Sequence, residues 1–184
     1  MSWYRRADRT GGAYFFTVVT YNRRKFLTDD LARRCLRGAW QKIKEKKPFV
    51  LEGLCLLTDH LHCIWRLPEN DNDFSTRWGG IKSLFSFYYF DQGGSESERS
   101  PSRQRSGEAA IWQRRFWEHL IKDQQDYSRH MDYIHYNPVK HGLVSKVVDW
   151  PWSTFHRYVK EGVYDENWGS QGLDWIDDFD CAGE

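Results

Sequence analysis

Runs of β-branched and aromatic residues alternate along the chain with segments whose apolar residues recur at helical spacing. Residues 13–20 (AYFFTVVT) are almost continuously apolar, which predicts a strand buried on both faces. Residues 49–57 and 60–67 predict two more strands, antiparallel to each other because a connection of only two residues joins them. A fourth strand is predicted within residues 111–122, which return to alternating apolar positions.

Three segments have the period of an amphipathic helix. The first begins near Thr28, a residue type that caps helices, and ends before Pro48. The second covers residues 74–90, and the third covers residues 123–136. The resulting order is β-α-β-β-α-β followed by one more helix, which predicts an α+β chain with a ferredoxin-like sheet, an added C-terminal helix and an irregular tail.

The segment 91–110 interrupts this pattern. It consists largely of Gly, Ser, Arg, Glu and Gln, and we expect a mobile loop there, either functional or a neutral insertion. We divide the chain into a domain of residues 1–160 and an acidic tail of residues 161–184.

Charge is distributed unevenly, although the whole chain has a formal net charge of only +1. Residues 1–47 hold 13 Lys and Arg against 4 Asp and Glu, whereas residues 161–184 hold 8 Asp and Glu and no Lys or Arg. A basic N-terminal third suits a polyanionic partner, although a solvated helix face explains it equally well. The candidate phosphate contacts are Arg5, Arg6, Arg23, Arg24 and Lys25.

The cysteines and the hydropathy pattern bear on the compartment. The four cysteines are scattered and form no C-x-x-C pair, which favours a reducing compartment and argues against a disulfide framework or a zinc knuckle. No apolar run is long enough to cross a membrane, and no apolar segment follows the N-terminal residues as in a signal peptide. We therefore expect a cytoplasmic protein with no membrane partner.

His60 and His62 stand at the start of the third predicted strand. Alternation along a strand places both imidazoles on one face, about 7 Å apart, which is half of a metal site. On spacing alone, a structural role for such a pair is the more common one.

Tyr133 and Asn137 are four residues apart on the third predicted helix and share a face. Asn137 precedes Pro138, which puts it at the last turn or cap of that helix. Its amide oxygen would suit a hard divalent cation beside the two imidazoles. Taken singly, Tyr133 is also explained as a core tyrosine, and Tyr127 and Tyr136 are rival candidates for a nucleophile.

Several motifs in order resemble the REP-associated tyrosine transposases, single-tyrosine members of the HUH endonuclease superfamily with a His-hydrophobe-His motif. The resemblance runs from about Tyr4 to Trp168 and departs from the family mainly in the long segment 91–110. The motifs are LTDHLHCIW (57–65), WQxxFWEH (112–119), DYIxxNPVKHG (132–142) and WPxSTFH (150–156).

The resemblance implies a reaction and a division of roles. Tyr133 would attack a DNA phosphate and form a 5′-phosphotyrosine link, while His60, His62 and Asn137 would hold one Mg²⁺ or Mn²⁺. Lys140, and with less support His130, would help the tyrosine; Lys140 would also contact DNA. The substrate implied is single-stranded or hairpin DNA of the REP type, in a bacterial cytoplasm at the nucleoid, with the protein a monomer or a homodimer.

Two other functions remain open on the sequence. One is a non-catalytic single-stranded nucleic-acid-binding module, a use to which ferredoxin-like sheets are well suited. The other is a metal phosphodiesterase that uses water, with Tyr133 incidental. The acidic tail has the wrong sign to bind DNA, and our hypothesis is that it folds over the basic cleft and competes with DNA.

Overall fold

The computed structural model describes residues 10–176 and residue 179. Its centre is a four-stranded antiparallel sheet with the strand order β2-β3-β1-β4. The strands are β1 (Ala13–Val19), β2 (Val50–Leu56), β3 (His60–Arg66) and β4 (Trp117–Leu120). The order of elements and of strands is that of a ferredoxin-like sheet, so the predicted fold class is confirmed.

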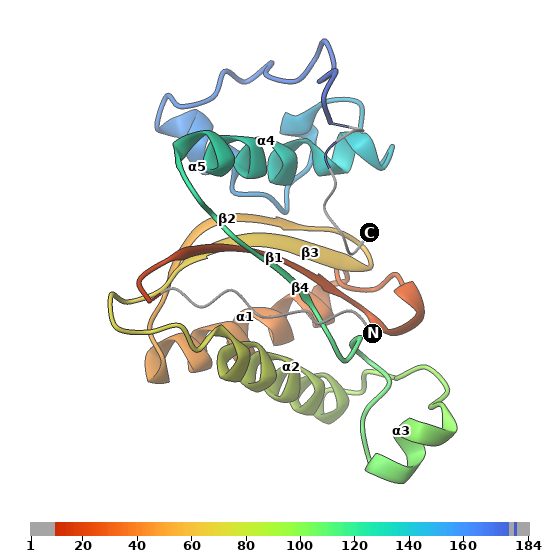
Figure 1. Ribbon diagram of the computed structural model, residues 1–184. Helices are drawn as coiled ribbons and strands as arrows, with labels where there is room; N and C mark the ends of the chain where they lie inside the picture. The colour runs from red at the N-terminus through yellow and green to blue at the C-terminus, as the bar shows by residue number, and fades with distance from the viewer. Residues whose placement is uncertain (1–9, 177–178, 180–184) are drawn as a thin grey trace.

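Helices cover both faces of this sheet (Figure 1). On one face lie α1 (Asp30–Lys46) and α2 (Phe74–Asp91). On the other face lie α4 (Gln124–Lys140), which is the added helix that carries the tyrosine, and the short α5 (Phe155–Lys160). A six-residue helix, α3 (Pro101–Ser106), stands to one side, and two 3₁₀ turns complete the chain at Tyr21–Arg23 and Val147–Asp149.

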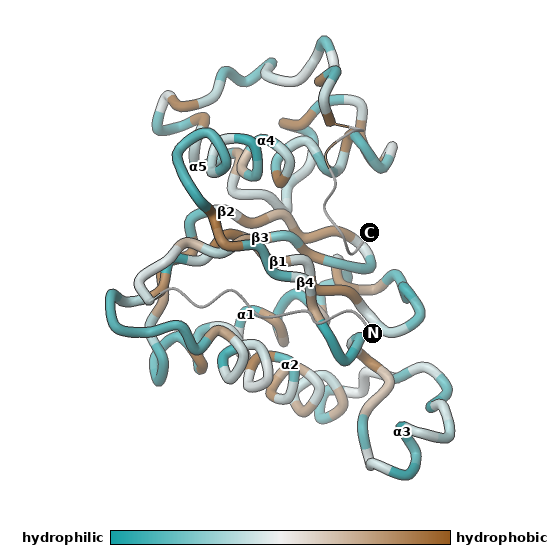
Figure 2. The backbone as a smooth tube through the Cα atoms, viewed as in Figure 1, coloured by the Kyte–Doolittle hydropathy of each residue, from teal (hydrophilic) through white to brown (hydrophobic). Residues whose placement is uncertain are grey.

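Alternation along β1 supplies both hydrophobic cores, as the continuous apolar run predicts. Tyr14, Phe16 and Val18 pack with α1 and α2, whereas Ala13 and Phe15 pack with α4. Hydrophobic residues accordingly concentrate along the sheet in Figure 2. The first core is strongly aromatic and stabilises the sheet on that face, with the rings of Trp65 and Trp78 stacked at a centroid distance of 4.3 Å.

One edge of the sheet is covered by a segment far along the chain. The amide of Leu56 donates to the carbonyl of Trp152 at 2.9 Å, and the amide of Thr154 donates to the carbonyl of Leu54 at 2.8 Å. Residues 152–154 therefore continue the hydrogen bonding beyond β2 and bring α5 onto the face that α4 occupies.

The helix bearing Tyr133 is longer than predicted. The expectation that it ends at residue 136 is wrong, because α4 continues through Pro138 to Lys140. Of the two positions predicted for Asn137, the last turn is correct and the cap is not. Proline removes one donor, but the turn closes beyond it: the amides of His141 and Leu143 donate to the carbonyls of Asn137 and Pro138. Three smaller differences are that β4 covers only four residues, that the first helix begins at Asp30, and that its N-cap is Asp29 rather than Thr28.

The segment 91–110 contains more structure than predicted. The expectation of a loop throughout is wrong for residues 101–106, which form α3 after the N-cap Ser100. The guanidinium of Arg103 is buried and donates to the carbonyls of Ala109 and Trp112. A polar composition hides this arrangement, since the packing rests on one arginine that bonds backbone oxygens rather than on apolar residues.

The C-terminal residues that the structure describes pack on α4 and α5. The hydroxyl of Tyr164 donates to Asp132, the ring of Trp168 lies against those of Tyr136 and Phe155, and Ile176 is buried. Residues 161–176 are irregular, as predicted, yet they belong to the second core. Within the described part of the chain, no helix combines the length and hydropathy needed to cross a membrane.

Candidate active site

Two hydrogen bonds orient the histidine pair on β3. The Nδ1 of His60 donates to the carboxylate of Asp59 at 2.6 Å, and a hydrogen bond of 3.0 Å joins the Nδ1 of His62 to the hydroxyl of Thr17. The register of the sheet causes the second bond, because Thr17 on β1 lies directly opposite His62. With each Nδ1 engaged, Nε2 is the candidate ligand atom of both rings.

The two imidazoles lie together, as the strand alternation predicts. Their ring centroids are 4.9 Å apart, and both side chains are buried. Asp59 also forms an ion pair with Arg23, with 3.4 Å between the charged atoms. Burial acts to raise the pKa of the Asp59 carboxyl, but its bonds to His60 and Arg23 outweigh burial and lower that pKa, so Asp59 is a carboxylate at neutral pH.

Tyr133 extends from α4 to this pair. Its ring centroid is 5.3 Å from that of His62, and its side chain is fully buried. The ammonium of Lys140 donates to the Tyr133 hydroxyl at 3.3 Å and lies 4.8 Å from the centre of its ring. Asn137, also fully buried, is one turn beyond Tyr133 on the same helix face.

The donor set fits a divalent metal ion. Two imidazoles whose Nδ1 atoms are bonded to a carboxylate and a hydroxyl have the orientation typical of metal ligands. A buried amide on the facing helix adds an oxygen of the kind that Mg²⁺ and Mn²⁺ accept. His60, His62 and Asn137 therefore remain our candidate ligands.

The rival tyrosines are engaged elsewhere. Tyr136 packs on Trp168 and Gly169, on the side of α4 that faces the C-terminal residues. Burial, together with a hydrogen bond to Tyr158, raises the pKa of Tyr127 well above its usual value, which makes its phenolate harder to form. Tyr133 is thus the tyrosine that the described structure places beside the histidine pair.

The basic residues predicted to contact DNA are placed in different ways. Arg5 and Arg6 lie outside the described residues. Arg23 pairs with Asp59, and Arg24 donates to the hydroxyl of Tyr89 at 3.0 Å and lies over the ring of Phe26. Lys25 is exposed, and Lys140 lies at Tyr133.

Several residues of the site were not found by sequence reasoning. Asp59 could have been, since a carboxylate directly before the first histidine is a natural partner for its Nδ1. Thr17 requires the strand register, and Phe15 and Phe179 require the tertiary fold. The rings of Phe15 and Phe179 flank that of Tyr133, with centroid distances of 6.1 and 5.1 Å.

Comparison with known proteins places this chain in a family. Residues 10–137 match the family model described as "Transposase IS200 like". The chain is 46% identical over 171 residues, 92% of its length and 94% of the relative's, to a Haemophilus influenzae protein assigned to the REP-associated tyrosine transposases. It is 44% identical over 176 residues to the Escherichia coli K12 REP-associated tyrosine transposase, covering 95% of each chain.

A solved structure supports the same family assignment. A REP-associated tyrosine transposase bound to a REP hairpin superposes with a TM-score of 0.74 at 44% sequence identity, covering 91% of each chain. The match confirms the resemblance that the sequence motifs carry. The chain therefore belongs to the IS200-like transposase family and, within it, to the REP-associated tyrosine transposases.

Proposed function

We propose that this transposase cuts and rejoins single-stranded DNA at REP-type hairpins through a covalent link between Tyr133 and a 5′-phosphate. The observation that carries the proposal is the position of Tyr133, between the oriented histidine pair and the ammonium of Lys140. A core tyrosine would need neither neighbour. A nucleophile for a phosphodiester needs both, since charge must be stabilised on the phenolic oxygen and on the phosphate.

In the proposed reaction, the phenolic oxygen of Tyr133 forms a bond to phosphorus while the bond to the 3′-oxygen breaks. The product is a phosphotyrosine and a 3′-hydroxyl, and because the phosphodiester energy is retained, the strand can be rejoined without ATP. Tyrosine is a weak nucleophile at its ordinary pKa of about 10, so it needs a neighbouring positive charge. Lys140 supplies that charge from two turns further along the same helix.

His60, His62 and Asn137 would hold one Mg²⁺ or Mn²⁺, which supplies polarisation of the scissile phosphate when it is bound. Asp59 and Thr17 hold the two imidazoles in the orientation that binding requires.

The relative bound to a REP hairpin supports hairpin DNA as the substrate of this chain as well. Arg5, Arg6, Arg23, Arg24 and Lys25 are our candidate phosphate contacts, with Lys140 at the reacting phosphate. Because Arg23 and Arg24 already bond to protein groups, DNA would have to replace or share those bonds. We further propose that the protein is located in the bacterial cytoplasm at the nucleoid. It would act as a monomer or as a homodimer.

A single experiment tests the proposed chemistry. Labelled hairpin DNA is incubated with the protein and Mn²⁺ and run on a denaturing gel. Tyr133→Phe is expected to abolish the protein–DNA adduct, because it removes only the phenolic oxygen. Tyr136→Phe serves as the matched control, since its ring packs on Trp168 instead. Cleavage without an adduct would favour the phosphodiesterase that uses water, and binding without cleavage would favour the non-catalytic module.

A further inference from the structure

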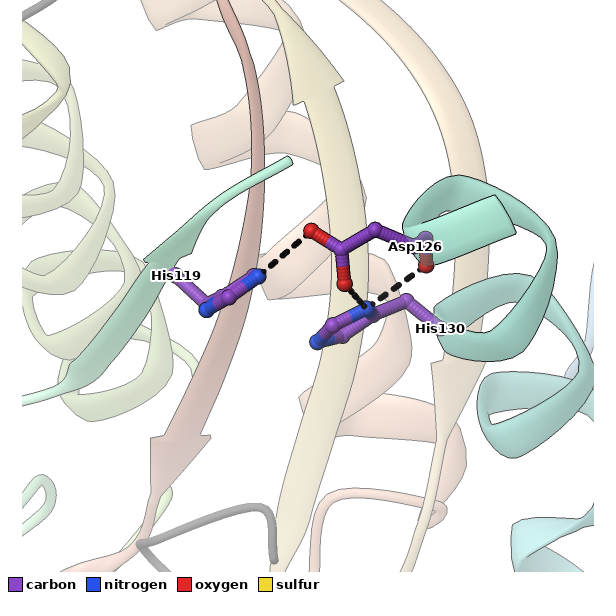
Figure 3. Close-up of side chains that lie close together, drawn as sticks. All are labelled: His119, Asp126 and His130. Atoms are coloured by element: carbon purple, nitrogen blue, oxygen red, sulfur yellow. Dashed lines mark hydrogen bonds and ion pairs between the residues drawn. The ribbon is translucent and has the colours of Figure 1, made fainter. Parts of the chain in front are cut away.

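A second group of metal-ligand side chains lies on the same face of the sheet, outside the site described above. His119 is on the edge strand β4, and Asp126 and His130 are one turn apart in the first half of α4 (Figure 3). The carboxylate of Asp126 accepts a hydrogen bond from the Nε2 of His119 at 2.8 Å. The Nδ1 of His130 lies 3.0 Å from the same carboxylate and donates to the backbone carbonyl of Asp126 at 2.8 Å. The two imidazole rings stack with their centroids 4.5 Å apart.

The geometry is close to that of a three-residue zinc site. One candidate ligand atom from each residue can be chosen so that all three lie within 4.8 Å of one another, the one such group found among the described residues. A tetrahedral site with metal–ligand bonds of about 2.0 Å has its ligand atoms about 3.3 Å apart. The two distances from the Asp126 carboxylate to the imidazoles, 2.8 Å and 3.0 Å, are within a few tenths of an ångström of that spacing. The ligand atoms of the two imidazoles lie within 4.8 Å of each other, and an ion bound at the Nδ1 of His130 would replace its bond to the Asp126 carbonyl.

The chemistry of the group favours a transition ion. Two imidazoles and one carboxylate are the ligand types of three-residue zinc sites, whereas Mg²⁺ prefers oxygen. The His130 side chain is 5% exposed, and those of His119 and Asp126 are 23% and 19% exposed. His130 is therefore nearly buried, whereas His119 and Asp126 are partly accessible to solvent, so water could complete the coordination of an ion.

This group is separated from the His60 and His62 pair. In the sheet, β1 lies between β3 and β4, and its Phe15 contacts both groups. The ring centroid of Phe15 is 5.5 Å from that of His62 and 4.8 Å from that of His130. An ion held by His119, Asp126 and His130 would therefore be distinct from one held by the histidine pair.

We propose that His119, Asp126 and His130 bind one divalent ion of the zinc class, with water as the remaining ligand. Such an ion would fasten the four-residue strand β4 to the first half of α4. Tyr133 follows one turn after His130, so the ion would fix the part of α4 that leads to the tyrosine. Its role would be positioning, because the group that bonds the Tyr133 hydroxyl at 3.3 Å is the ammonium of Lys140.

Cobalt and zinc titrations test the proposal separately from the transposase chemistry. In full-length protein with His60→Ala and His62→Ala, one equivalent of Co²⁺ is expected to bind and to give the visible absorption of tetrahedral coordination. Zn²⁺ at about 100 times its Kd is expected to raise Tm by about 5–10 °C. Adding His119→Gln should abolish both effects, whereas adding His156→Gln should abolish neither, since His156 bonds the carbonyl of Trp150 instead.

An absent Co²⁺ spectrum in the His60→Ala and His62→Ala background, or one that survives His119→Gln, would overturn the assignment. If that background fails to fold, Co²⁺ stoichiometry replaces it: two equivalents are expected for the natural sequence and one for His119→Gln, and equal stoichiometry would count against the site. Neither readout depends on DNA cleavage, so these experiments test the second metal site independently of the proposed function.

Discussion

At the scale of single residues, the hydrogen bonds at Nδ1 decide what the histidines of the site can do. Asp59 holds the ring of His60, and the carboxylate is itself held by Arg23. Such a carboxylate behind a ligand imidazole both orients the ring and increases its basicity. We therefore propose Asp59 as a positioning residue, and its loss should be visible in the dependence on metal concentration.

Asp59→Ala is expected to weaken the apparent affinity for Mn²⁺ in hairpin cleavage by about 10- to 100-fold. Cleavage should recover at high Mn²⁺, because the ligand atoms themselves remain. The measurement is the cleavage rate as a function of Mn²⁺ concentration. Asp30→Ala is the control, since it removes an exposed carboxylate that pairs with Arg33 instead. An unchanged Mn²⁺ dependence in Asp59→Ala would contradict the role of Asp59.

Lys140 allows a second test at this scale. Lys140→Met keeps most of the side-chain volume but removes the charge that faces the Tyr133 hydroxyl. We expect the single-turnover cleavage rate near pH 7 to fall about 10- to 100-fold, because the phenolate loses its neighbouring cation. DNA affinity should fall only about threefold, as for one lost phosphate contact. Lys146→Met changes an exposed lysine and should alter neither quantity. A loss of affinity as large as the loss of rate would refute the assigned role.

At the scale of elements, the N-terminus of α2 shows how a local signal stabilises the fold. The side chain of Asp73 accepts from the amide of Thr76 at 3.0 Å and pairs with Lys47 at 2.6 Å. Burial acts to raise the pKa of the Asp73 carboxyl, but these bonds outweigh it and lower the pKa to about 2. The stabilisation is therefore present above the ordinary pKa of 3.8 and is lost as pH falls through about 2.

Asp73→Ala is expected to lower the free energy of unfolding by about 1 kcal/mol at pH 6, and Asp73→Asn by less, because asparagine also caps helices. The difference between the natural sequence and Asp73→Asn should shrink between pH 4 and pH 2, as the carboxylate is protonated. Urea unfolding across that pH range is the measurement. A difference that stays constant would show that the charge of Asp73 contributes nothing.

The element boundaries show where sequence reasoning succeeds. Apolar residues at helical spacing predict α2 within a residue, and the apolar run of residues 13–20 predicts β1 and its two buried faces. Pro138 misleads, because proline is a stop signal in the chain but is accommodated near the end of α4. The polar segment around Arg103 also misleads, since its order depends on bonds from a charged side chain to the carbonyls of Ala109 and Trp112.

Sequence reasoning likewise identifies some residues of the candidate site and misses others. His60, His62, Tyr133, Asn137 and Lys140 can be named from the sequence, because each stands in a motif with fixed spacing. Thr17 and Phe179 cannot, because their proximity arises from strand pairing and from the return of the C-terminal residues. The cluster of His119, Asp126 and His130 combines an i, i+4 pair with a residue from another element, and spacing alone reveals only the pair.

At the scale of the whole molecule, the C-terminal residues return to the site. The ring of Phe179 lies 5.1 Å from that of Tyr133 and 4.9 Å from that of His130. This contact supports our hypothesis that the acidic tail competes with DNA. Deleting all of residues 161–184 would be a poor test of this hypothesis, because Tyr164, Trp168 and Ile176 belong to the second core and their loss would disturb the fold.

Deleting residues 177–184 removes Phe179 together with four Asp and Glu, and keeps Tyr164, Trp168 and Ile176 of that core. We expect affinity for single-stranded hairpin DNA to rise about three- to tenfold at low salt, with less gain at high salt, and adduct formation to become faster. Phe179→Ala, which keeps the charges, separates the ring from the electrostatic effect. If affinity and adduct formation were unchanged by the deletion, the tail would have no role in competition.

The covering of β2 by residues 152–154 has a consequence for synthesis of the chain. The amide of Leu54 donates to the hydroxyl of Thr154 at 2.9 Å, a bond between residues 100 positions apart. At about 5–20 residues per second, a ribosome makes Thr154 about 5–20 s after Leu54. Until then β2 has no partner on its outer side, and an uncovered edge strand can pair with another nascent chain. The danger of aggregation is therefore concentrated in that interval, and it ends when residues 152–154 emerge.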